Sequence, residues 1–193
     1  KVLGYMMEFT VLKTKVKISP LFFAVLTAFL ISDRNGIAPV VIGFSLVHEL
    51  CHFAALAAIK TAPQEVNVSA AGISMSLNGG MSTVKKILVL AAGAAGNFVL
   101  AAFFSAADNR LFFTVNLIIG IFTILPLCST DGGSILTEFA EKFFPERAER
   151  ICRNIFLFCG ATAAVILASA VVINKNPYLL IALFYAVICL LKY

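Results

Sequence analysis

Long apolar stretches separated by short polar connections dominate the chain from about residue 20 onward. Most of them approach the roughly 20 apolar residues that a helix needs to cross a bilayer. The six predicted spans are 21–31, 37–59, 87–107, 111–128, 155–173 and 178–191, of which the first is the shortest. The pattern therefore predicts an α-helical polytopic membrane protein, with residues 1–193 forming a single membrane-embedded domain.

The connection between the second and third predicted spans has a different pattern. Apolar and polar residues alternate over Val66–Leu77, and Asn78-Gly79-Gly80 is a turn signal. We expect a short re-entrant β-hairpin whose edge could receive an extended substrate peptide. The substrate-binding candidates there are Gly72, Ile73, Ser74 and Met75. A two-stranded connector without a substrate role is the alternative. A second amphipathic pattern, over 134–144, predicts a short helix at the membrane surface.

Composition supports a membrane protein and excludes several other classes. Of the 193 residues, 61% are hydrophobic and only 13% are charged, which is too little polar surface for a soluble domain or a disordered chain. The net charge of +5 comes from 15 Lys and Arg against ten Asp and Glu, and the basic residues are spread between the apolar runs. Because they form no dense basic stripe, nucleic acid is not an expected partner, and the lipid bilayer is.

The positions of the basic residues predict the orientation of the chain in a cell membrane. If the N-terminus is cytoplasmic and the six spans alternate, twelve of the 15 Lys and Arg lie on the cytoplasmic side. The three on the other side are Arg34, Arg110 and Lys175. Both termini of this multi-pass protein are therefore predicted to be cytoplasmic, together with the connections at about 60–86 and 129–154.

Candidate chemistry is concentrated in the second predicted span. The only two histidines of the chain, His48 and His52, are four positions apart, and Glu49 follows the first. Positions i and i+4 share one helix face, so two imidazoles can bind one Zn²⁺ with Glu49 beside its open position. A purely structural use of the histidines is the alternative. However, the six predicted spans contain no Lys or Arg, which leaves Glu49 without an obvious counter-ion there other than a metal.

A catalytic zinc site has three protein ligands, so a third ligand is expected. Asp131 is the strongest candidate because it follows an apolar run and precedes Gly132-Gly133, which lets the backbone bend after an unwound stretch near Pro126. Glu65 and Glu138 are weaker candidates, and a helix-capping role is the alternative for Asp131. The five cysteines form no CxxC pair and are interpreted as small buried apolar residues.

These motifs together resemble the site-2 protease family of intramembrane zinc metalloproteases. The family's second motif usually reads N-x-x-P-x-x-P-x-D-G, and Pro126, Asp131 and Gly132 match it. Two positions differ from that motif, at Thr123 and Ser129. The stretch 92–97, Ala-Gly-Ala-Ala-Gly-Asn, is similar to the family's A-G-P-x-A-N. Six spans without a PDZ domain resemble the sporulation stage IV factor B branch, although the CBS domain common there is absent.

The resemblance implies a zinc-dependent intramembrane endopeptidase with one Zn²⁺ bound by His48, His52 and Asp131 and with Glu49 as the general base. The implied substrate is a membrane-embedded or membrane-associated protein, such as a pro-form transcription factor, cut near the cytoplasmic side. Asn97, Asn116 and Thr123 are candidate oxyanion donors from the residues themselves, and Asn97 and Thr123 are also candidates for substrate contact. For each of the three, a structural use in helix packing is the alternative. An inhibitory membrane protein and the oligomeric state are left open by the sequence.

Two other functions use the same residues. A membrane metal-ion transporter could pass ions through the His48, Glu49, His52 and Asp131 cluster, but no further carboxylates or histidines mark a path along the spans. A catalytically inactive membrane scaffold would tolerate loss of the ligands, whereas the full set is present.

Overall fold

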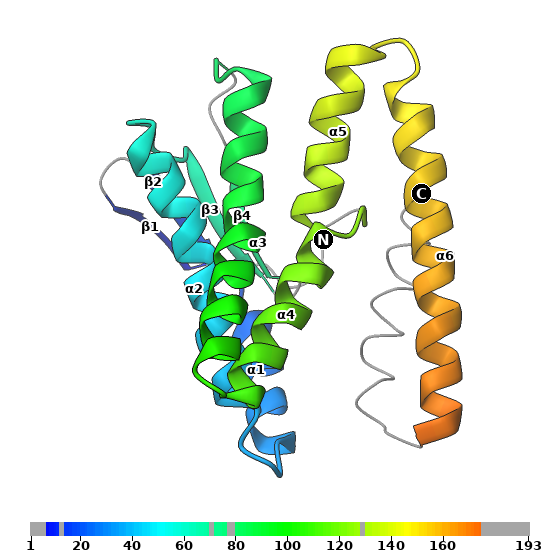
Figure 1. Ribbon diagram of the computed structural model, residues 1–193. Helices are drawn as coiled ribbons and strands as arrows, with labels where there is room; N and C mark the ends of the chain where they lie inside the picture. Colours follow the sequence, from blue (N-terminus) through cyan, green and yellow to red (C-terminus); the bar gives the residue numbers. More distant parts are fainter. Residues whose placement is uncertain (1–6, 12–13, 70–71, 77–79, 128–129, 175–193) are drawn as a thin grey trace. The chain divides into compact units, whose positions relative to one another are not determined.

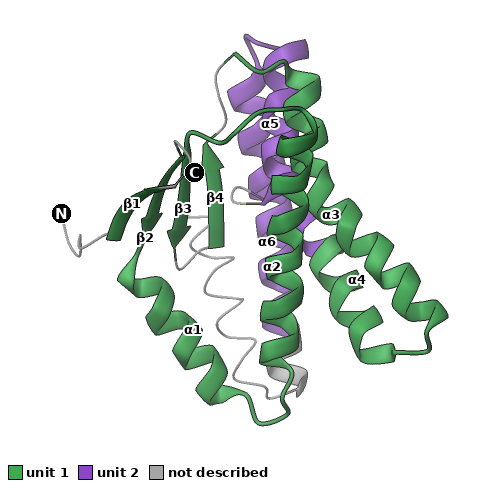
Figure 2. Ribbon diagram, turned by 90° about the vertical axis from the view of Figure 1, so that its left-hand side faces the viewer, with its two compact units in different colours: residues 1–121 green, residues 122–193 purple. Residues whose placement is uncertain are grey.

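The computed structural model describes residues 7–11, 14–69, 72–76, 80–127 and 130–174, shown as coloured ribbon in Figure 1. The chain divides into two compact units, residues 1–121 and 122–193 (Figure 2). The first unit contains a small sheet and the helices α1, α2, α3 and most of α4. The second contains the end of α4 and the helices α5 and α6.

Five of the six predicted spans correspond to helices of the structure. These are α1 (Pro20–Ser32), α2 (Ala38–Ala58), α3 (Thr83–Ala106), α4 (Arg110–Ile124) and α6 (Ala148–Asn174). Within the described residues, α2, α3 and the 148–169 part of α6 are long and apolar enough to cross a membrane, while α1 and α4 are shorter apolar helices. The predicted span at 178–191 lies outside the described residues, so the number of six spans stays a prediction.

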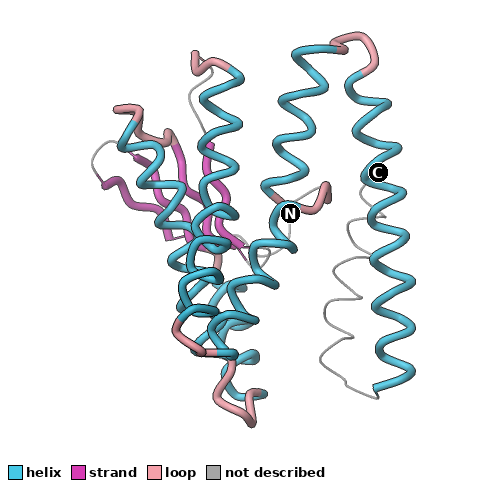
Figure 3. Tube along the Cα trace, viewed as in Figure 1, coloured by secondary structure: helices cyan, strands magenta, loops and turns pink. Residues whose placement is uncertain are grey.

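A four-stranded sheet belongs to the first unit, and its strands are drawn in magenta in Figure 3. Its strands are β1 (Met7–Val11), β2 (Thr14–Ile18), β3 (Glu65–Ser69) and β4 (Gly72–Ser76), in the order β1-β2-β3-β4. The predicted hairpin is present as the antiparallel pair β3–β4, but its strands are joined between Ser69 and Gly72, which pair with each other, and not at the turn signal of residues 78–80. The β1–β2 hairpin was not predicted from the sequence. It joins the sheet through parallel pairing of β2 with β3.

The shared sheet places the N-terminal strands beside the connection that leads from α2 to α3. This arrangement agrees with the predicted common side of these two segments, although which side of the membrane that is stays a prediction. An ion pair of 2.8 Å between Lys17 on β2 and Glu65 on β3 links the two strands. The hydrogen bond to Glu65 raises the pKa of Lys17. Glu65, a weaker candidate for the third metal ligand, is thus paired with a cation on the sheet.

Polar residues define the ends of the long helices. The carboxylate of Asp33 accepts hydrogen bonds from the backbone N–H groups of Asn35 and Ala38, and the bond from Ala38 lowers the pKa of Asp33. Just after α2, Lys60 has a φ of 55°, and the N–H groups of Lys60 and Thr61 donate to carbonyls of the last turn of the helix. These contacts form a Schellman motif, which usually has glycine at that position.

The second unit is built from two helices that pack against each other, α5 (Asp131–Phe143) and α6. Their buried contact contains Ala140, Ala148, Cys152 and Phe156, with Leu136 packed against it. The predicted surface helix at 134–144 is confirmed as a helix, and it begins earlier, at Asp131. Among the described cysteines, Cys51, Cys152 and Cys159 are free, and Cys152 is buried.

Candidate metal centre

The two histidines lie at the contact between α2 and α3, which run side by side in Figure 1. Both are buried, with 5% of each residue exposed. They face a stripe of α3 made of Val89, Gly93 and Asn97, whose members are spaced four residues apart and are all buried. The i, i+4 spacing of the histidines therefore matches an i, i+4 spacing on the partner helix.

Each histidine is held through its Nδ1 atom. The Nδ1 of His52 lies 2.7 Å from the carbonyl oxygen of Val89, and the Nδ1 of His48 lies 2.7 Å from Oδ1 of Asn97. Because both partner atoms are oxygens that accept, each Nδ1 carries the hydrogen and donates it. The neutral rings consequently present Nε2 lone pairs, which is the tautomer that binds a metal through Nε2.

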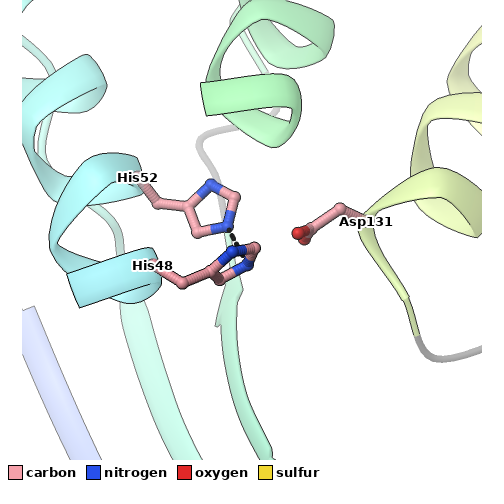
Figure 4. A group of neighbouring side chains, drawn as sticks. All are labelled: His48, His52 and Asp131. Carbon is pink, nitrogen blue, oxygen red and sulfur yellow. Dashed lines mark hydrogen bonds between the residues drawn. The ribbon is translucent and has the colours of Figure 1, made fainter. Parts of the chain in front are cut away.

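The two Nε2 atoms converge on one place. They are 3.1 Å apart, and Figure 4 draws this approach as a dashed line between the rings of His48 and His52. Two nitrogens at about 2.0–2.1 Å from one zinc ion, in tetrahedral geometry, would lie about 3.3 Å apart. Two lone pairs cannot hydrogen-bond to each other, whereas a shared cation would stabilise both. The donor set of this histidine pair therefore fits a zinc ion.

Gly93 provides the room for the two rings. A Cβ at this position would lie 2.6 Å from Nε2 of His48 and closer still to Nε2 of His52. One turn of α3 further on, a Cβ at Gly96 would collide with the thiol of Cys51. The small residues of 92–97 thus allow α3 to approach the histidine face of α2 closely.

Asp131 belongs to the second unit, where it is the first residue of α5 and is half-buried. The helix cap is Thr130, whose side-chain oxygen accepts the N–H of Gly133, so the capping alternative for Asp131 is wrong. The Thr130 hydroxyl also lies within hydrogen-bond distance of the Leu125 and Leu127 carbonyls. These contacts hold the unwound stretch around Pro126 against the start of α5. Thr130 was not identified from the sequence, because an isolated threonine carries no pattern.

The two glycines after Asp131 let this stretch approach the helix closely. A Cβ at Gly132 would lie 2.7 Å from the carbonyl oxygen of Leu125 and closer to that of Ile124, and one at Gly133 would collide with the carbonyl of Leu127. The obstacles are backbone atoms, which cannot move aside as a flexible side chain can. The Asp-Gly-Gly pattern therefore reflects packing of the chain onto its own backbone.

We expect Gly132→Ala to displace the first turn of α5 and to lower the stability of the protein by about 1–3 kcal/mol, the usual cost of overpacking. Zinc binding should weaken as well if Asp131 is a ligand. Thermal unfolding in detergent and zinc titration would measure both effects. Gly80→Ala is the control, because a Cβ at Gly80 meets no described atom within 4 Å. Wild-type unfolding and zinc affinity in the Gly132 variant would contradict the prediction.

The other candidates lie at several places. Glu49 is half-buried on α2 directly after His48, and Thr123 is half-buried in the last turn of α4. Asn97, predicted to contact substrate, is instead 1% exposed and hydrogen-bonded to His48. Glu138 is half-buried on α5. The hairpin candidates occupy most of β4, and their exposed fractions alternate along the strand.

Fold and histidine pair together define a helical membrane protein with a candidate metal-binding centre. No family model matches the chain, and no curated protein matches it. Among solved structures, the chain is similar to the site-2 protease from Methanocaldococcus jannaschii, with a TM-score of 0.67 and 16% identity over 97% of this chain and 93% of that one. The chain therefore has the site-2 protease fold, as the motifs imply. The sporulation branch stays a prediction.

Proposed function

We propose that this protein is an intramembrane zinc metalloprotease that cleaves a membrane-associated or transmembrane protein near the cytoplasmic side of the cell membrane. The observation that carries the proposal is the buried histidine pair, whose two Nδ1 atoms donate to fixed acceptors while the two Nε2 atoms converge. The likeness to a site-2 protease supports the proposal, because the motif residues lie in a shared fold.

Asp131 would supply the third ligand. The sequence predicts it as the acidic residue that completes the ligand set of the two histidines on α2. Figure 4 labels all three. Two neutral imidazoles and one carboxylate are a ligand set known for catalytic zinc sites, which keep one position open for water. Bound there, zinc would lower the pKa of water and polarise the peptide carbonyl.

Glu49 would act as the general base. It accepts a proton from the attacking water and returns the proton to the amine that leaves when the peptide bond breaks. Its place directly after His48 puts it on a neighbouring position of the same helix turn, so it needs no separate element to reach the metal-ligand face. Glu49 is half-buried, which leaves part of its side chain accessible to solvent or substrate.

The edge of the sheet is the proposed place for the substrate backbone. A transmembrane helix hides its peptide groups in hydrogen bonds, so its scissile segment must become extended before hydrolysis. Strand β4 pairs with β3 on one side, and no other described strand pairs with its second edge. An extended peptide added there would gain backbone hydrogen bonds, and Gly72, Ile73, Ser74 and Met75 would contact its side chains.

The test uses the full chain purified in detergent and reconstituted into liposomes with membrane proteins from the same source. We expect about one zinc per chain and new protein termini inside or next to transmembrane segments, mapped by mass spectrometry and suppressed by phenanthroline. A chain that binds no zinc, or chelator-independent termini, would contradict the proposal. Zinc-dependent ion flux across the liposomes without new termini would favour the transporter instead.

A further inference from the structure

A chain of two buried side-chain amides connects His48 to helix α4. Asn97 donates through Nδ2 to Oδ1 of Asn116 at 3.0 Å, and Asn116 donates through Nδ2 to the carbonyl oxygen of Phe112 at 2.9 Å. Asn97 is 1% exposed and Asn116 is fully buried. Burying two amides among apolar helices costs free energy that apolar side chains of similar size would not cost. Their hydrogen bonds therefore call for a role beyond packing.

The donor and the acceptor of each hydrogen bond in this series of amides follow from its last acceptor, the carbonyl of Phe112. The carbonyl of Phe112 can only accept, so Asn116 must present its Nδ2 to it and its Oδ1 to Asn97. Asn97 must then donate through Nδ2 to Asn116, which turns its Oδ1 toward His48. An oxygen at that place can only accept, so the hydrogen of His48 is held on Nδ1 and the Nε2 lone pair faces the metal position.

We propose that Asn116, acting through Asn97, is a positioning residue that sets the tautomer of His48. This inference rests on the proposed metal centre and assigns to α4 a part in it, although α4 contributes no ligand. With Asn116 replaced by an apolar residue, nothing would prevent the Asn97 amide from turning over. Asn97 would then offer Nδ2 to His48, and the ring would carry its hydrogen on Nε2, where it blocks metal binding.

His52 provides an internal control. Its Nδ1 donates to the backbone carbonyl of Val89, whose direction no side-chain substitution on α4 reverses. Because the chain has only two histidines, ¹⁵N labelling of histidine gives ring signals from these two residues alone. In the metal-free wild-type protein, above the pH at which the rings are protonated, we expect both rings to carry the hydrogen on Nδ1.

In Asn116→Leu we expect the His48 ring to shift toward the Nε2–H form while His52 keeps its hydrogen on Nδ1. Asn116→Ser is the second variant, because a serine hydroxyl in a helix bonds the carbonyl four residues back but is too short to reach Asn97. It should shift His48 in the same way with a smaller loss of packing. If Asn116→Leu does not fold, the His48 ring signals of Asn116→Ser test the proposal instead.

Zinc affinity gives an independent measurement. Loss of a partner that orients a metal-bound histidine typically weakens metal binding 10–100-fold, and we expect this loss for both variants in competition with a chromophoric chelator. Asn116→Asp should bind zinc within about threefold of wild type, because a protonated carboxyl donates to Phe112 and accepts from Asn97 as the amide does. If Asn116 only filled space, the order of zinc affinities would be reversed: Asn116→Leu would bind zinc normally and Asn116→Asp would bind it weakly.

Two results would overturn the proposal. One is a folded Asn116→Leu or Asn116→Ser protein whose His48 signals and zinc affinity equal those of wild type. The other is a wild-type protein whose His48 carries its hydrogen on Nε2. A wild-type protein that shows the Nδ1–H form of His48 but binds no zinc would contradict the proposed metalloprotease and leave the tautomer result intact, so the two failures are distinguishable.

Discussion

Glu49→Gln is expected to abolish detectable peptide cleavage while the protein still binds about one zinc. Glutamine has nearly the same shape as glutamate but cannot take a proton from water, and a general base typically contributes 10²–10⁴-fold to the rate. The ligands His48, His52 and Asp131 are unchanged in this variant. Cleavage-site mapping in liposomes and zinc analysis of the same preparation would measure the two effects separately.

Glu149→Gln is the matched control, because it makes the same chemical change at an exposed position in the first turn of α6. We expect it to cleave at the wild-type rate. Undiminished cleavage by the Glu49 variant would refute the assigned base. Loss of zinc together with loss of cleavage would instead place Glu49 among the ligands.

Gly93→Ala is expected to remove both zinc binding and cleavage. The added methyl group would lie where the Nε2 atoms of both histidines lie, at 2.6 Å from that of His48. The rings cannot simply move away, because the Asn97 amide and the Val89 carbonyl hold their Nδ1 atoms at 2.7 Å. Either the rings give up these hydrogen bonds or α3 moves away from α2, and both disturb the ligand atoms. We expect zinc affinity to fall by about 100-fold, the upper end of the loss that is typical when the orientation of a metal ligand fails.

Gly43→Ala is the control for this prediction. Gly43 lies on α2, and a Cβ there would meet no described atom within 4 Å. Alanine is the better helix former by roughly 1 kcal/mol, so this variant should fold at least as well as wild type and bind zinc normally. Chelator titration and thermal unfolding of the two variants side by side would test the expectation. Normal zinc affinity in Gly93→Ala would mean that the rings do not bind metal in the arrangement seen here.

The apolar runs and the i, i+4 histidines could be identified in advance because both signals are local. A span depends on the hydropathy of consecutive residues, and two ligands on one helix face depend only on helix geometry. The β3–β4 hairpin was predicted for the same reason, since its strands adjoin in sequence. Strands β1 and β2 were missed because β2 pairs with β3, which lies about fifty residues farther along the chain.

The hydrogen bonds that link His48, Asn97 and Asn116 could not be predicted from the sequence. Asn97 and Asn116 are polar residues within apolar runs, and the sequence leaves both oxyanion contact and helix packing open for them. Their hydrogen bonds to His48 and to each other join three helices, α2, α3 and α4. No periodicity within one helix reports which residue of another helix it meets, so the partners were decided by packing.

By itself the sequence determined that this is a membrane protein with its scarce polar chemistry gathered at one histidine pair, because hydropathy and helical spacing are properties of neighbouring residues. The tertiary structure alone decided which atoms orient that pair. Those are the Val89 carbonyl, the Asn97 amide and the space left by Gly93, all supplied by α3. The physical reason is that the tautomer of a histidine ring, and the space available to that ring, depend on atoms that helix packing brings within 3 Å. These atoms belong to residues about 40 to 50 positions away in the sequence.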